Sequence, residues 1–371
     1  MKLRFVKMSP AGNTTVFVLD PVPLPEQVNI ALALMDPAVL GGEQVGFVTL
    51  CPAGGPPGTG LGQDGPSPEI AALLRMMGGE FCGNAARALG AYLAYKRFPG
   101  LSWAGDVARG LIQVSGATAP IEFEAQVDRN GLPGRAGCRF PGPFRVLFYQ
   151  TRVALEGALV YERCSGAGSL SPTGPDTTSG SCKGEGYELV ERAGPPETGA
   201  NQSTELTARA QGAGTPVPDA ACRRQTAFAV VHMPGIVHIV LAADDYAPAE
   251  EVLFRLRSVL RLEGAPCVGV MFCSGLGPGC EREDRHGDLV VPLVHVPATD
   301  TTVWESSCAS GAVAVALARA AACGRPGRFM SKQPGGNLDT TVDWDVWQSG
   351  QGVRVRLEGE VRLVAEGEVL L

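Results

Sequence analysis

The sequence predicts an α+β protein built from two similar halves, each with strands arranged around one helix of small residues. Short β-branched runs, separated by glycine and proline turns, recur along the 371-residue chain and predict many strands. Twice, such a run leads to a glutamate and a cysteine that precede an alanine-rich helix, in residues 80–87 (EFCGNAAR) and 305–312 (ESSCASGA). Helices of alanine and glycine allow strands to approach closely, which suits a helix enclosed by a curved sheet.

The first half begins with a strand, a glycine turn and a second strand within residues 3–19. A short helix is expected over residues 23–35, because Pro25 lies near its start. Further strands are expected at residues 43–50, 70–77, 111–115 and 121–127. After Cys82, apolar residues recur at helical spacing, which predicts a helix with a buried face.

The second half repeats this order of strands and helices. Strands are expected at residues 144–149, 227–232, 236–242, 268–272, 289–296 and 302–304. A helical pattern covers residues 247–262, and a helix of small residues covers 309–322, directly after Cys308. The chain closes with a strand at residues 353–357 and a pair of short strands through Val369.

This organisation predicts two domains and a long insertion. The parts are an N-terminal domain (1–142) carrying Cys82, a C-terminal domain (143–350) carrying Cys308, and closing strands (351–371) that return to the N-terminal domain. Residues 164–223 are rich in Gly, Ser, Thr, Pro and Glu and lack sustained periodicity. We therefore predict that they form a flexible insertion at the surface.

The composition narrows the classes of partner. The formal net charge is −7 and no basic stripe occurs, which argues against nucleic acid and anionic membranes as partners. No apolar run reaches membrane-spanning length and no secretion signal is visible, so we expect a cytoplasmic protein. Eleven scattered cysteines, without C-x-x-C pairs, indicate reduced thiols and no structural metal site. The glycine-rich loop at 54–65 lacks the lysine and spacing of a phosphate-binding loop.

Cys82 and Cys308, which lie in the two similar segments 80–87 and 305–312 and are called the framed cysteines below, are the best candidates for catalytic residues. A thiol at a helix N-terminus faces unpaired N–H groups and the positive end of the helix dipole, which favour thiolate. Two such thiols on opposite sides of a carbon can remove a proton from one face and return one to the other, without a cofactor. We therefore predict that Cys82 and Cys308 are the two acid–base groups of a racemase. A single cysteine before a helix is more often a small buried hydrophobe, but two in matched frames favour catalysis.

Residues beside the cysteines are candidates for binding the substrate. Backbone N–H groups that would face a substrate carboxylate at the helix openings belong to Gly83, Asn84, Ser310 and Gly311. Glu80 and Glu305 either orient these openings, bind the substrate ammonium or are exposed capping carboxylates. His238 lies in an apolar strand pattern and is interpreted as a core histidine.

The cysteine frames resemble the two signatures of diaminopimelate epimerases, and residues 9–13 (SPAGN) resemble the N-terminal loop of that family. The resemblance covers most of the chain apart from the insertion. It implies two related domains, each a β-roll around a central helix, with the active site in the cleft between them and no cofactor. It also implies that Asn13 contacts the substrate.

Within this superfamily the chain is most similar to the histidine racemases of staphylopine-type metallophore biosynthesis. The supporting segments are residues 9–13, 43–47 (EQVGF), 79–85 (GEFCGNA), 303–308 (VWESSC) and 333–336 (QPGG). Diaminopimelate epimerases carry a Glu-Arg-Gly element before the second cysteine, whose arginine holds the distal carboxylate. The corresponding residues here, 296–302 (VPATDTT), contain no arginine, and Ala309 replaces the usual glycine.

These features predict an amino-acid racemase with a small-molecule substrate, most simply L-histidine converted to D-histidine for an opine-type metallophore. The acid and amide of Glu43 and Gln44 suit a side chain with N–H donors, such as imidazole. One alternative is a diaminopimelate epimerase, and another is a non-catalytic amino-acid-binding protein on the same scaffold. A homodimer is the expected assembly.

Overall fold

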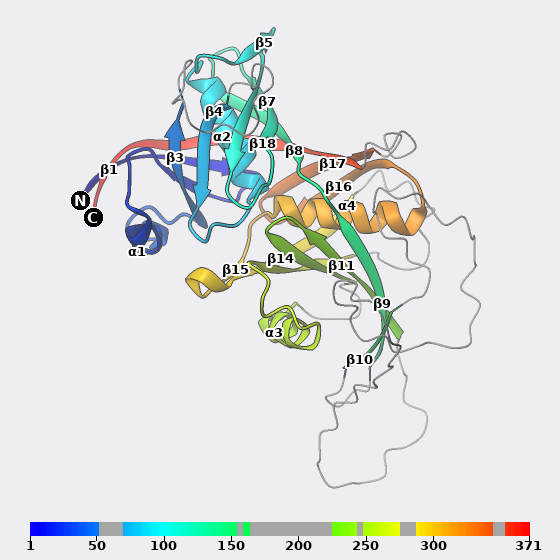
Figure 1. The fold of residues 1–371 in the computed structure, drawn as a ribbon. Coiled ribbons are helices and arrows are strands. Elements are labelled where there is room, and N and C mark those ends of the chain that lie inside the picture. Colours follow the sequence, from blue (N-terminus) through cyan, green and yellow to red (C-terminus); the bar gives the residue numbers. More distant parts are fainter. Residues whose placement is uncertain (52–69, 154–158, 164–224, 243–247, 275–286, 344–352) are drawn as a thin grey trace, which may run out of the picture.

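The computed structural model describes residues 1–51, 70–153, 159–163, 225–242, 248–274, 287–343 and 353–371. These residues form a mixed α+β fold in which a sheet curves around helices, as the sequence predicted (Figure 1). The predicted insertion at 164–223 and the glycine-rich loop at 54–65 lie outside the described residues.

The sheet of the first half closes into a roll. Its strands are β1 (Lys2–Pro10), β2 (Thr15–Val18), β3 (Gln44–Leu50), β4 (Ile70–Met76), β5 (Ser102–Ala104), β6 (Val107–Val114), β7 (Ile121–Val127) and β8 (Pro133–Phe140). They pair in the order β1–β2–β3–β4–β6–β7–β8, with β5 on β6. The last strand of the chain, β18 (Arg354–Leu370), pairs with both β8 and β1 and closes the roll.

Two helices belong to this half, one inside the roll and one outside. The inner helix, α2 (Gly83–Tyr95), is buried at every residue from Gly83 to Ala94. Small residues make this possible, because a Cβ on Gly90 would lie only 2.6 Å from Cγ of Phe123 on β7. The outer helix, α1 (Leu24–Met35), turns its buried face toward β3.

The second half wraps a sheet around its own central helix. Its strands are β9 (Arg145–Val153), β10 (Leu159–Arg163), β11 (Gln225–Met233), β12 (Ile236–Ala242), β13 (Val268–Cys273), β14 (Asp288–Val296), β15 (Thr301–Trp304), β16 (Gly327–Gln333) and β17 (Gly336–Asp343). They pair in the order β10–β9–β11–β12–β13–β14–β16–β17–β18, with β15 also on β14. The central helix is α4 (Ala309–Cys323), and α3 (Glu250–Val259) packs on the opposite face of the sheet.

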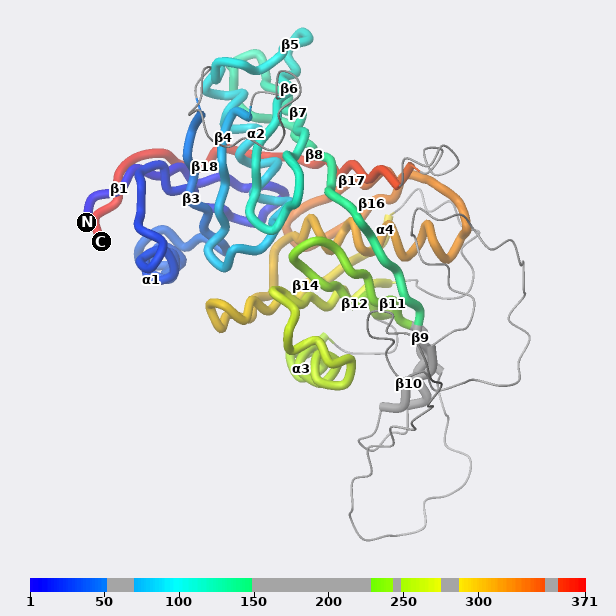
Figure 2. The backbone as a smooth tube through the Cα atoms, viewed as in Figure 1, coloured from blue at the N-terminus to red at the C-terminus, as the bar shows by residue number. Residues whose placement is uncertain are grey.

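β18 connects the two rolls. Residues Val355–Gly359 pair with β17 on one edge and with β8 on the other, and Val361–Leu370 pair with β1 (Figure 1). Hydrogen bonds between Met1 and Leu371 therefore bring the two ends of the chain side by side (Figure 2). The sequence prediction of several short strands here was wrong. Gly359 makes room for Leu338 and Asn337 of β17 instead of forming a turn.

Most other predicted elements are confirmed within one to three residues, but five strands were missed, β5, β8, β10, β16 and β17. β5 has three residues, and β8, β16 and β17 have many charged residues and glycines among few β-branched ones. These strands form because partner strands cover one or both edges, a condition that local sequence does not report.

The domain boundaries remain a prediction. Among the described residues, no helix is long and apolar enough to cross a membrane. Six described cysteines are free, whereas Cys323 at the end of α4 is disulfide-bonded, so the prediction of reduced thiols was wrong for this residue.

Candidate active site

The two framed cysteines occupy equivalent positions in the two halves. Cys82 is the N-cap residue of α2 and Cys308 is the N-cap residue of α4, with almost the same backbone angles (φ −126°, ψ 112° and φ −119°, ψ 110°). In each case the sulfur accepts a 3.4 Å hydrogen bond from the backbone N–H three residues later, Ala85 or Gly311. The prediction that both cysteines open helices is confirmed.

One pocket contains both cysteines. It is open to solvent on one side and is lined by residues of both halves. Its walls combine apolar side chains with the cysteines and three glutamates. The lining residues include Glu43, Gln44, Glu80, Cys82, Gly83, Asn84, Ile236, Cys267, Val294, Val296, Glu305, Cys308 and Ser310. Asn13 and Gly311 are predicted site residues that do not line it.

The two helix openings are packed directly against each other. A Cβ on Gly83 would lie 3.1 Å from Cβ of Ala309 and 2.8 Å from Cε2 of Phe140. Glycine is therefore required at the start of α2 by packing. Ala309, which differs from the glycine usual in diaminopimelate epimerases, fits because its counterpart on α2 has no side chain.

Cys82 ends a chain of side-chain hydrogen bonds from the first half. Its thiol donates to Oε1 of Gln44 at 2.9 Å. Nε2 of Gln44 donates to Oδ1 of Asn13 and, at 3.2 Å, to Oγ1 of Thr15. Nδ2 of Asn13 in turn donates to the Glu43 carboxylate at 3.1 Å. Gln44 and Asn13 are thus committed to holding Cys82.

Cys308 is held by different partners, from the second half. Gln333 on β16 binds its backbone at two points, accepting from the N–H at 2.5 Å and donating to the carbonyl at 3.2 Å. The sulfur is 3.5 Å from Oγ of Ser310, and that hydroxyl is 2.8 Å from Nε2 of His238 on β12. His238 is fully buried, and burial lowers the pKa of its imidazole to about 3, so the ring is neutral.

Glu43 connects the two halves beside the pocket. Its carboxylate accepts hydrogen bonds from the backbone N–H (3.0 Å) and the hydroxyl (2.6 Å) of Ser306, which lies two residues before Cys308. With the bond from Asn13, three of about four acceptor positions of a carboxylate are used. The backbone of Thr14 also lies within hydrogen-bonding reach of this carboxylate, so its acceptor positions are largely used within the protein.

A second connection runs through Asn84 on α2. Its Nδ2 donates to the carbonyl of Ser307 at 2.6 Å, and its Oδ1 accepts from Arg87 at 3.1 and 3.3 Å. Arg87 is fully buried and also donates to the Glu360 carbonyl on β18. The side chain of Asn84 therefore joins the two cysteine loops.

Glu80 and Glu305 are not exposed capping carboxylates. Oε2 of each is buried without a hydrogen-bond partner among the described residues, and both side chains line the pocket. Burial raises the pKa of both carboxyl groups, that of Glu305 to about 8. A buried carboxylate oxygen without a partner costs about 1–3 kcal/mol, so this pair favours a ligand that brings a cation.

The sequence analysis expected low thiol pKa values, and this is wrong for the protein without ligand. Burial raises the pKa of both Cys82 and Cys308 above the usual range, and the nearby carboxylates raise it further. The backbone N–H groups at the helix openings act in the predicted direction but are outweighed, because the thiols lose more hydration than one N–H bond returns.

Sequence reasoning missed three residues that organise the site. The sequence singles out Gln333 only as part of a family segment and Ser306 only as a neighbour of Cys308. The interpretation of His238 as a core histidine is confirmed by its complete burial, but its bond to Ser310 beside Cys308 was not predicted. Only His238 gave a signal of its own, because a histidine in an apolar strand needs a buried partner.

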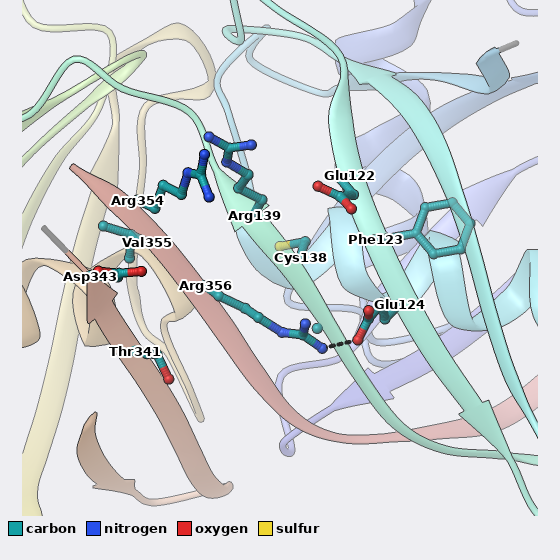
Figure 3. A pocket seen from close by; sticks show the side chains of 11 residues that line it. Glu122, Phe123, Glu124, Cys138, Arg139, Thr341, Asp343, Arg354, Val355 and Arg356 are labelled. Carbon is teal, nitrogen blue, oxygen red and sulfur yellow. Dashed lines mark hydrogen bonds and ion pairs between the residues drawn. The ribbon is translucent and has the colours of Figure 1, made fainter. Parts of the chain in front are cut away.

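A second hollow on the surface is a poor candidate for the active site. It lies over β7, β8, β17 and β18 and is lined by arginines and acids, including Arg139, Arg354 and Glu122 (Figure 3). Arg356 forms an ion pair with Glu124 there. Opposite charges balance each other in this hollow, and neither framed cysteine lines it.

Comparisons with known proteins bear on the family and the fold of this chain. The family model described as "Histidine racemase CntK N-terminal domain" matches residues 2–135 and 219–370. A solved hydroxyproline epimerase from Agrobacterium vitis, with bound trans-4-hydroxy-L-proline, is 12% identical with a TM-score of 0.51, over 100% of this chain and 93% of that one. A probable proline racemase from Agrobacterium radiobacter K84, with bound carbonate, is 9% identical with a TM-score of 0.50, over the same shares. No curated protein matches. The two solved structures support the fold.

Proposed function

Because the chain belongs to the histidine racemase CntK N-terminal domain family and is therefore an amino-acid racemase or epimerase, we propose that it interconverts L- and D-histidine with two thiols. The observation that carries this proposal is the composition of the pocket. Cys82 and Cys308, on two converging helix openings, line one pocket with three glutamates. Among the described lining residues there is no lysine or arginine.

In the proposed reaction one cysteine, as thiolate, takes the α-proton of the substrate, and the other, as thiol, gives its proton to the opposite face. The bond from carbon to hydrogen breaks on one side while a new one forms on the other, and the two cysteines end with exchanged protonation states. The backbone N–H groups at the starts of α2 and α4 would hold the substrate carboxylate. Fixed dipoles of this kind stabilise the charge that develops in the transition state.

The carboxylates of the pocket support a cationic substrate with a single carboxylate. Glu80 and Glu305 each have a buried oxygen free for the α-ammonium. Glu43 lines the same pocket, and its carboxylate suits an imidazole N–H. A second carboxylate, as in diaminopimelate, would find no lysine or arginine among the described lining residues, so a diaminopimelate epimerase is disfavoured.

We assign the D-histidine product to opine-type metallophore synthesis in the cytoplasm, on the basis of the family resemblance. Disruption of the gene should then remove a metallophore that contains D-histidine, and added D-histidine should restore it. Production that is unaffected by the disruption would contradict this assignment.

The activity is tested by incubating the protein with single amino acids in heavy water. Histidine should gain α-deuterium and racemise faster than diaminopimelate, lysine or alanine. A faster reaction with diaminopimelate would identify diaminopimelate, and not histidine, as the substrate. Tight histidine binding without any α-deuteration would instead identify a binding protein.

The substrate contact of Glu43 is tested with Glu43→Gln. This change keeps the size of the side chain but replaces one acceptor oxygen with a donor. We expect the KM for histidine to rise about tenfold or more, since a hydrogen bond to a charged group is worth about 1.5–3 kcal/mol. An unchanged KM would show that the imidazole is bound elsewhere.

A further inference from the structure

The hydrogen bonds around the two thiols have opposite directions, although the two helix openings share the same backbone geometry. We infer that Cys308 is the cysteine that ionises more readily and Cys82 the one held as thiol, and that His238 is the positioning residue that sets this difference. The inference rests on the two-thiol reaction proposed above and deepens it.

The direction of the side-chain hydrogen bond at Cys82 follows from a chain of groups whose roles as donor or acceptor are fixed. The Glu43 carboxylate already accepts from the backbone N–H of Ser306 at 3.0 Å, so Asn13 must present its N–H₂ group to it. Oδ1 of Asn13 then accepts from Nε2 of Gln44. The amide of Gln44 is thereby oriented with its carbonyl oxygen toward the sulfur, 2.9 Å away. A carbonyl oxygen can only accept, so it favours the protonated thiol of Cys82.

The direction of the side-chain hydrogen bond at Cys308 follows from the surroundings of His238. Nδ1 of this ring is buried and has no hydrogen-bond partner among the described residues. It lies against Gly269 on the paired strand β13, where a Cβ would come within 2.6 Å of the ring carbon Cε1. A neutral imidazole carries one N–H, and a buried N–H without a partner is rarer than an acceptor without one.

The proton of His238 therefore lies on Nε2, which donates to Oγ of Ser310 at 2.8 Å. The Ser310 hydroxyl, having accepted this bond, directs its own hydrogen to the sulfur of Cys308, 3.5 Å away. With the N–H of Gly311, this sulfur receives two donors, and hydrogen bonds to the charged form favour thiolate. Cys82 receives backbone donors from Ala85 and Asn84, so the difference between the two thiols comes from their side-chain partners.

Other titratable groups face these thiols. Glu305, in the loop before α4, is within hydrogen-bonding reach of Cys308 and opposes its ionisation, and Glu80 and Glu305 act in the same direction on Cys82. Burial raises the pKa of Glu305 to about 8, so at neutral pH this carboxyl is mainly uncharged and opposes a thiolate less. Glu43 and the third thiol of the pocket, Cys267, complete the set of titratable groups.

The test is alkylation of the free protein with iodoacetamide over a pH series, with each cysteine followed by mass spectrometry. The pH midpoint, rather than the rate, reports thiolate formation at each site. We expect the midpoint of Cys308 to be lower than that of Cys82, although Cys308 is only 4% exposed and Cys82 is half-buried. A lower midpoint for Cys82 would overturn the assignment.

Variants separate a positioning role of His238 from a structural one. His238→Phe and Ser310→Ala should each raise the midpoint of Cys308 by about one pH unit, the equivalent of one hydrogen bond to a charged group. The midpoint of Cys82 should not move in either variant. His238→Gln, whose amide can donate to Ser310, should restore part of the shift.

Equal shifts at both cysteines in His238→Phe would show a structural role and contradict the inference. Ser310→Ala, a smaller change, gives the same information if the histidine variant does not fold. Since alkylation does not require turnover, the result is independent of the histidine assay. Racemisation of histidine together with a lower midpoint for Cys82 would reject only the assignment, whereas the expected midpoints without any α-deuteration would reject only the proposed reaction.

Discussion

The openings of α2 and α4 share one backbone geometry but have different side-chain surroundings. Both cysteines are N-caps, both sulfurs accept an N–H at 3.4 Å, and both lie beside a glutamate with a buried oxygen that has no partner in the described part of the chain. Cys82 faces an amide oxygen, whereas Cys308 faces a hydroxyl that is bound to a histidine. The comparison teaches that repeated local structure supplies two similar bases, and that tertiary partners make them different.

The largest expected effect comes from removing either member of the pair. Cys82→Ala and Cys308→Ala should each lower racemisation by about 10³-fold or more, because inversion needs an acid and a base on opposite faces. Optical rotation of histidine over time measures this. Cys51→Ala, at a free cysteine outside the pocket, is the matched control and should keep full activity. Full activity in either of the other two variants would show that the pair does not act as proposed.

The next largest effect tests the two hydrogen bonds between Gln333 and the backbone of Cys308, which have no counterpart at Cys82. Gln333→Ala leaves the buried backbone N–H of Cys308 without its acceptor and should lower the free energy of unfolding by about 1–3 kcal/mol. Urea denaturation measures the loss. Gln126→Ala removes an exposed amide that donates to Asp106 and should change stability by less than about 0.5 kcal/mol. Equal stability of the two variants would mean that water replaces the hydrogen bonds that Gln333 makes to the Cys308 backbone.

A smaller effect distinguishes equivalent positions at the two helix starts. Gly83→Ala places a methyl group 2.2 Å from Cζ of Phe140 and should cost about 1–3 kcal/mol by overpacking. Ala309→Gly, the opposite exchange at the start of α4, loses only helix propensity and a small contact, about 1 kcal/mol. Urea denaturation of the two variants in parallel measures both values. A stabilised Gly83→Ala variant would show that this glycine is not required by packing.

The smallest effect concerns pH. The folded-state pKa of Glu305 is raised from 4.5 to about 8 by burial, so the stability it contributes is complete below pH 4.5 and is lost as pH rises through 8. Glu305→Gln removes this titration, and its melting temperature should fall less than that of the wild type between pH 5 and 9, by about 2 °C or more. Thermal unfolding followed by circular dichroism measures the two profiles. Parallel profiles for the wild type and Glu305→Gln would show that the raised pKa does not belong to Glu305.

Local patterns predicted the helices and most strands because their signals lie within a few residues. The small-residue helices, the N-cap cysteines and the strand leading to each are examples. β16 and β17 were missed, since they are strands by virtue of their pairing and place Gln333 against Cys308. β18 was divided wrongly, because a strand that changes partners at Gly359–Val361 resembles two short strands in sequence.

The same limit applies to the site. The two cysteines were predicted, but their raised pKa values were not, because burial depends on the walls that the rest of the chain builds. Glu80 and Glu305 were considered as capping or ligand-binding residues, and the structure gives each a buried oxygen. Asn84 was expected at the substrate, whereas its side chain binds Ser307, 223 residues away.

The sequence alone determined that two cysteines cap two helices, since capping depends on residues within one turn of the cysteine. It also determined the acids of the pocket and the absence of an arginine in residues 296–302. The tertiary structure decided which group each thiol meets, because Gln44 lies 38 residues from Cys82, and His238 lies 72 residues from Ser310. Contacts at such separations follow from strand pairing and helix packing, which no local pattern encodes.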